Sequence, residues 1–87
     1  MQALLRAFHA LPEGGFTAVH AGRRYRVVKT SHADARSRKL VARALDGSDY
    51  ISLNLYLLRD GRALLRPCEM PERKVRDFIL GAVPESV

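Results

Sequence analysis

The segment 50–58 constrains the fold most, because its side chains alternate between apolar and polar residues with a period of two. The apolar positions are Ile51, Leu53, Leu55 and Leu57, and the positions between them include Ser52, Asn54 and Tyr56. Successive side chains of a β-strand point to opposite faces of a sheet, so this alternation predicts a strand with one buried face and one outer face. The chain is therefore expected to build a sheet around this strand.

Four other segments have the composition of strands and are separated by turn signals. They are 16–20, 24–30, 38–45 and 63–66, and the turns carry Ala21-Gly22, Asp46-Gly47 and Asp60-Gly61. Residues 31–37 are expected to form a polar loop. The segment 38–45 fits a helix as well as a strand, because its apolar residues satisfy either period. We favour a strand there, since it pairs simply with both neighbours.

Amphipathic helices are predicted at both ends of the chain. Residues 2–11 carry an apolar stripe and are followed by Pro12, while Pro71 opens a second helix over 71–82. The element order is then α-β-β-β-β-β-α. Short connections favour an α+β fold in a single domain, 1–87, with an antiparallel meander of about five strands and both helices on one face. The other face of the sheet would be left open.

The positive charge is concentrated in residues 21–43. The whole chain has 15 Lys and Arg against 9 Asp and Glu, a net charge of +6. Residues 21–43 alone contain eight basic residues and one acid, Asp34, so the remainder is close to neutral. Such a segment attracts polyanions, meaning nucleic acid, an anionic membrane or an acidic protein.

No apolar run approaches the roughly 20 residues that span a bilayer, so no membrane insertion is expected. The N-terminal residues do not have the pattern of a signal peptide. Cys68 is the only cysteine, which excludes an internal disulfide and a cysteine-based zinc site. These observations favour a cytoplasmic protein.

The open sheet face is the main candidate site. If the apolar residues of 50–58 face the helices, then Tyr50, Asn54 and Tyr56 face outward. Lys39 and Arg43 line up beside them, with Arg62 or Arg66 on the other side. Tyrosines stack on bases, amides form hydrogen bonds and arginines bind phosphates, as a platform for single-stranded nucleic acid requires. The candidate residues for binding nucleic acid or another anion are Arg24, Arg26, Lys29, Arg36, Arg38, Lys39, Arg43, Tyr50, Asn54 and Tyr56. Alternatively, the same face is covered by a second copy of the chain in a homodimer.

Catalytic chemistry has weaker support. Cys68 precedes the second predicted helix and follows Arg66, a setting that can make a thiol nucleophilic. A buried, inert cysteine fits the sequence better, because there is no second cysteine to complete a redox cycle. His9, His20 and His32 lack the spacing of metal ligands. We therefore predict a non-enzymatic binding module with no catalytic residues, metal or cofactor.

Three stretches resemble a family of small bacterial proteins of about this length. They are Gly22-Arg23-Arg24-Tyr25, the run from Asp49 to Tyr56, and Pro67-Cys68-Glu69-Met70-Pro71. The resemblance covers most of the chain. That family has no established activity, so the resemblance assigns no role to any residue.

Overall fold

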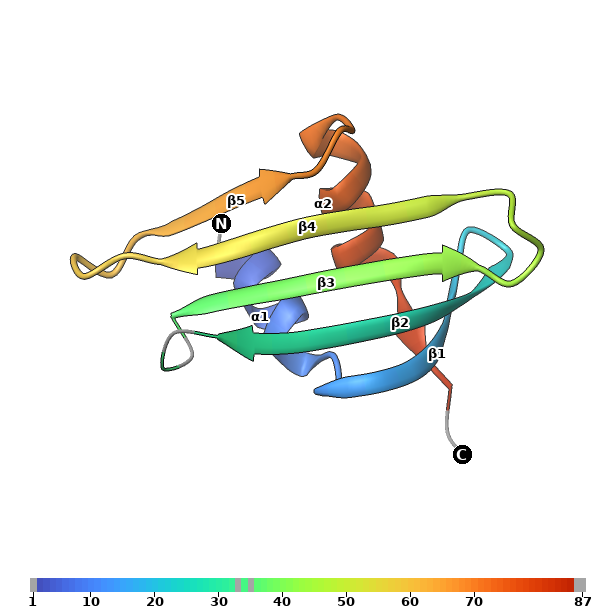
Figure 1. Ribbon diagram of the computed structural model, residues 1–87, viewed down its shortest axis with the longest axis horizontal. Coiled ribbons are helices and arrows are strands. Elements are labelled where there is room, and N and C mark those ends of the chain that lie inside the picture. The colour runs from blue at the N-terminus through green and yellow to red at the C-terminus, as the bar shows by residue number, and fades with distance from the viewer. Residues whose placement is uncertain (1, 33, 35, 86–87) are drawn as a thin grey trace.

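The computed structural model describes residues 2–32, 34 and 36–85, which form two layers: an antiparallel sheet and two helices packed on one of its faces (Figure 1). The elements are α1 (Gln2–Ala10), β1 (Gly14–His20), β2 (Arg23–His32), β3 (Ser37–Ala44), β4 (Tyr50–Leu57), β5 (Ala63–Pro67), α2 (Glu72–Gly81) and β6 (Val83–Pro84). The described residues make a six-stranded sheet in the order β5-β4-β3-β2-β1-β6. The predicted α+β fold, with a meander and both helices on one face, is confirmed.

The ambiguous segment 38–45 is a strand. Leu40, Ala42 and Ala44 of β3 are buried and face the helices, whereas Leu45 is 58% exposed just beyond the strand. A helical stripe would have needed Leu45 in the core. The period of two therefore decides the structure here, and β3 pairs with β2 on one side and β4 on the other.

The expected polar loop at 31–37 is shorter than predicted. The β2–β3 ladder continues outward to the pair His32–Ser37, so residues 31, 32 and 37 belong to strands. The hydroxyl of Ser31 also donates a hydrogen bond to Oε1 of Glu13 at 2.8 Å. Backbone pairing extends the hairpin beyond its apolar residues because an exposed ladder needs no buried side chains. Residues 33 and 35 of this segment lie outside the described residues.

The sixth strand, β6, was not predicted. Val83 and Pro84 pair with Val19 and Ala18 of β1, and the amide of Glu85 donates to the carbonyl of Thr17 at 2.9 Å. The sequence suggested only that Pro84 lies near the end of the second helix. A proline lacks an N–H donor and is therefore tolerated at the edge of a sheet, which is where β6 lies.

The core lies between the sheet and the helices. Phe8 of α1 and Phe78 of α2 are fully buried, and the Phe78 ring meets the ring of Tyr25 edge-on at 5.0 Å. The other core residues are Leu4, Leu11, Ala18, Val27, Leu40, Ala42, Ala44, Ile51, Leu53, Leu55, Leu65, Val75 and Ile79. All the apolar side chains of β4 that were predicted to face the helices do so, with Leu57 half-buried at the strand end.

A buried lysine joins the sheet to α1. Lys29 is only 2% exposed and points toward the helices, where its Nζ donates to the carbonyls of Phe8 at 2.7 Å and Leu11 at 2.8 Å. The same Nζ lies 4.6 Å from the centre of the Phe8 ring. Burial lowers the pKa of Lys29. The positive end of this side chain thus completes the hydrogen bonds of carbonyls at the C-terminal end of α1.

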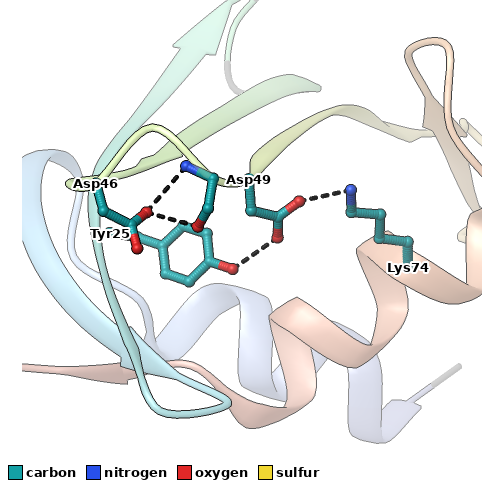
Figure 2. A network of polar contacts seen from close by, with 5 residues as sticks. Tyr25, Asp46, Asp49 and Lys74 are labelled. Atoms are coloured by element: carbon teal, nitrogen blue, oxygen red, sulfur yellow. Dashed lines mark hydrogen bonds and ion pairs between the residues drawn. The ribbon is translucent and has the colours of Figure 1, made fainter.

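A polar network joins the β3–β4 turn to α2 (Figure 2). One carboxylate oxygen of Asp49 accepts a hydrogen bond from the hydroxyl of Tyr25 at 2.6 Å, and the other lies 2.7 Å from Nζ of Lys74. Burial by itself raises the pKa of Asp49, but the hydrogen bonds from Lys74 and Tyr25 outweigh it and bring the pKa to about 2. Within the turn, Asp46 accepts hydrogen bonds from the backbone and the hydroxyl of Ser48. The network holds the start of β4 in place.

Among the described residues, neither helix has the length and apolar character needed to cross a membrane.

Candidate functional site

The face of the sheet turned away from both helices is here called the open face. Its outward positions on β1 to β5 are Gly15, Thr17, Val19, Arg24, Arg26, Val28, Thr30, His32, Ser37, Lys39, Val41, Arg43, Tyr50, Ser52, Asn54, Tyr56, Leu64 and Arg66. The strand register aligns these side chains in rows that cross the sheet. Cross-strand neighbours on one face interact directly, so each row is a unit of surface.

The first row crosses four strands near the β3–β4 turn. Tyr50 pairs with Arg43, Arg43 with Arg26, and Arg26 with Thr17. The Arg43 guanidinium lies over the Tyr50 ring, with its carbon 4.7 Å from the ring centre. This is a cation–π contact, and it leaves Tyr50 39% exposed.

Arg26 is accommodated by a glycine on the neighbouring strand. A Cβ placed on Gly15 would lie 2.7 Å from Nη2 of Arg26, closer than atoms can approach. The guanidinium therefore lies across backbone that has no side chain of its own. The sequence indicated Gly15 only as part of the stop after the first helix, so its role beside Arg26 was missed.

The second row lies toward the opposite end of the strands. Arg66 pairs with Asn54, Asn54 with Lys39, and Lys39 with Thr30. Of the two alternatives Arg62 and Arg66, Arg66 is therefore the one aligned with Asn54 and Lys39. Arg62 lies in the β4–β5 turn instead, where its Nε is 2.6 Å from a carboxylate oxygen of Asp60.

Between these two rows the outward side chains are small and uncharged. Val28 is paired with Val41, and Val41 with Ser52, whose carbonyl accepts the amide hydrogen of Cys68 at 3.0 Å. Val28 is 44% exposed. The cationic rows are therefore separated by a low, uncharged strip.

A third row ends in a hollow. Ser37 pairs with Tyr56, and Tyr56 with Leu64. An open hollow of about 560 Å³ lies here, lined by these three residues and by Arg36, Leu57, Leu58 and Arg59. Tyr56 is 37% exposed at its edge. Of its lining residues, Arg36 and Tyr56 were among the predicted binding residues, whereas Arg59 and Leu64 were not.

The outward strand positions of the open face carry only positive charge. Among the described residues, its outward strand positions carry five cations, namely Arg24, Arg26, Lys39, Arg43 and Arg66, and no Asp or Glu. Arg24 forms an ion pair with Glu85, which follows β6, at 2.8 Å. Asp49 and the acids of α2 lie on the helix side of the sheet. A surface with this segregation attracts anions.

Not all of the predicted basic residues belong to this surface. Lys29 does not lie on it, because it is buried on the opposite face and donates to the carbonyls of Phe8 and Leu11. Arg38 alternates to the helix side, where its Nη1 lies 3.2 Å from Nδ1 of His9. Burial and then the nearby Arg38 charge lower the pKa of His9. Arg36 lies at the hairpin end, on the rim of the hollow.

Cys68 is half-buried just after β5. Within the described part of the chain, its sulfur has one recorded polar contact, the side-chain nitrogen of Asn54 at 3.7 Å. Three residues separate Cys68 from the first residue of α2, Glu72, so the thiol is not at the helix terminus. Residues 2–32, 34 and 36–85 contain no group of three His, Cys, Asp or Glu side chains that could hold a metal ion.

Comparison of the chain with protein-family models, with curated proteins and with solved structures found no match. The resemblance to a small bacterial family therefore stays an expectation, and function has to be argued from the open face itself.

Proposed function

We propose that this protein is a non-enzymatic module that binds single-stranded nucleic acid on its open face. The observation that carries the proposal is that the described outward strand positions of one sheet face combine five cations and two exposed tyrosines with no Asp or Glu, while Glu85 at the sheet edge pairs with Arg24. Cations neutralise phosphates, and aromatic rings stack on bases whatever their sequence. The Asn54 amide, between Lys39 and Arg66, adds a group that can hydrogen-bond to a base edge.

A single strand suits this surface better than a duplex does. The open face is a sheet, with both helices on the far side (Figure 1). Reading a duplex through the major groove takes a helix or a two-stranded ribbon inserted into the groove. Tyr50 and Tyr56 can stack only on bases that are not already stacked within a double helix.

A homodimer that buries the open face is the competing function. In that arrangement the open-face cations of one copy would meet those of the other. Among the described residues, the outward strand positions carry no carboxylate, and Glu85 at the sheet edge is already paired with Arg24. Like charges juxtaposed across an interface cost several kcal/mol. Charge therefore favours a polyanion over a second copy as the occupant.

The proposal is tested by fluorescence anisotropy with a labelled DNA strand of about ten nucleotides, within the ~4–16 nucleotide site sizes of comparable modules. We expect binding at about 50 mM salt, with weaker binding to a duplex of the same length. The double variant Lys39→Gln, Arg43→Gln removes two charges from the open face. The matched control, Arg6→Gln, Arg73→Gln, removes two from exposed positions of α1 and α2.

The open-face variant should lose at least about tenfold in affinity, and the control less than about threefold. The proposal is overturned if the wild-type protein binds no single strand at low salt, or if the two double variants lose affinity equally. A protein that sediments as a dimer and also fails to bind DNA would favour the competing function.

A further inference from the structure

We infer that the hollow beside Tyr56 takes one unstacked nucleobase of the bound strand, with an adjacent phosphate on Arg36 or Arg59. This inference rests on the proposed function and assigns a specific subsite to it. The hollow holds about 560 Å³, within the range of about 300–1,000 Å³ typical of small-ligand sites.

The lining has the chemistry of a base site. Tyr56, Leu58 and Leu64 supply an aromatic ring and aliphatic walls, which are what a planar base packs against. Arg36 and Arg59 give the same hollow two guanidinium groups. An occupant that is apolar at its centre and anionic at its edge matches both features, and a nucleotide is such a molecule.

The position of the hollow continues the cationic rows. Ser37 and Tyr56 lie two residues along their strands from Lys39 and Asn54. Arg43 lies six residues after Ser37 on β3, which is about 20 Å of extended strand. A single strand that crosses the first two rows therefore reaches the hollow without leaving the open face.

The hollow has little means of choosing among bases. The backbone amide of Leu57 already donates to the Arg36 carbonyl, and that of Leu58 to the Arg62 carbonyl, each at 2.8 Å. The hydroxyls of Ser37 and Tyr56 are the remaining neutral side-chain donors of the lining. Base binding here should thus depend on stacking and be tolerant of sequence.

Two probes of about ten units separate base from backbone: an oligodeoxyadenylate and an abasic deoxyribose-phosphate strand of equal length. Tyr56→Ala should weaken binding of the oligodeoxyadenylate about fivefold or more and leave the abasic strand within about twofold. Leu64→Ala should act in the same direction. Leu80→Ala, an exposed leucine of α2 on the far side of the molecule, is the matched control and should change neither affinity.

A second measurement does not depend on any variant. In methyl-labelled wild-type protein, ring currents from a stacked adenine should shift the methyl resonances of Leu58 and Leu64, and the abasic strand should not. The inference is overturned if these methyls do not respond to the oligodeoxyadenylate, or if Tyr56→Ala weakens both strands equally or neither. In those cases binding to the wild type persists and the proposed function stands. If neither strand binds the wild type, the proposed function itself fails.

Discussion

The Arg43 guanidinium lies over the ring of Tyr50, its carbon 4.7 Å from the ring centre, directly across the β3–β4 ladder. Asp49, the residue before Tyr50, is bound on the other side of the sheet to Tyr25 and Lys74. The Arg43–Tyr50 contact therefore lies next to the point where α2 is bound to the start of β4. The cation of Arg43 and the ring of Tyr50 stay in contact because the contacts of Asp49 fix the pairing of β3 with β4 at this end of the strands.

Replacement of Tyr50 tests whether its ring contributes to binding. Tyr50→Leu keeps an apolar side chain and the cations around it but removes the stacking surface. We expect affinity for a single strand to fall about fivefold or more, because base–aromatic stacking contributes roughly 1–3 kcal/mol. Binding titrations with the exposed control Leu45→Ala should match the wild type. Equal affinities for Tyr50→Leu and wild type would exclude the ring from the site.

Gly15→Ala separates binding from stability. The new Cβ would lie 2.7 Å from Nη2 of Arg26, so the flexible Arg26 guanidinium must move away. The free energy of unfolding in urea should change by less than about 1 kcal/mol, since the atom displaced is at the end of an exposed side chain. Affinity for the single strand should fall toward that of Arg26→Gln. An unchanged affinity would show that the position of Arg26 over Gly15 is not used.

Lys29→Met tests the buried lysine as a structural residue. The substitution leaves the carbonyls of Phe8 and Leu11 without their donor. A buried polar group that loses its partner costs about 1–3 kcal/mol, so the free energy of unfolding should fall by at least that much. The free energy of unfolding of Lys39→Met, a change on the open face, should stay within about 0.5 kcal/mol of the wild-type value. If Lys29→Met is as stable as wild type, the hydrogen bonds to α1 contribute nothing.

The contacts of Asp49 predict how the free energy of unfolding decreases at acid pH. The folded pKa of Asp49, about 2, lies below its ordinary value of 3.8. The stabilisation is therefore complete above the ordinary value and is lost as the pH falls toward 2. Asp49→Asn should lower the free energy of unfolding by roughly 1–2 kcal/mol at pH 7, because solvent partly screens Lys74.

The pH profile gives a sharper check than the stability at one pH. Between about pH 4 and pH 2, the free energy of unfolding should fall less steeply for Asp49→Asn than for the wild type. Asp77→Asn, which changes an exposed aspartate of α2, should retain the wild-type profile. Parallel profiles for wild type and Asp49→Asn would contradict the role of this carboxylate.

The sheet was predictable because its side chains alternate. The pattern at Ile51, Leu53 and Leu55 identified β4, and pairing with it placed Lys39 and Arg43 on the open face. The sixth strand was not predictable from a two-residue segment ending in Pro84, since its pairing to β1 depends on where α2 ends.

The candidate site was only partly predictable, because charge in a sequence does not say which way a side chain points. Lys29 lies in the basic segment, yet strand alternation turns it toward α1, where helix carbonyls receive it. Arg66 lies outside that segment and reaches the open face through its pairing with Asn54. The hollow near Leu58 depends on how the β4–β5 hairpin folds back, which no local pattern reports.

The dependence of binding on salt tests the central claim most directly. With four or five phosphates neutralised on the open face, a plot of log K against log salt for a single strand should have a slope of about −3. The same plot for Lys39→Gln, Arg43→Gln should be flatter by about 1.4, since two contacts are removed. A slope near zero for the wild type, or no binding at about 50 mM salt, would contradict the assignment of the open face to single-stranded nucleic acid.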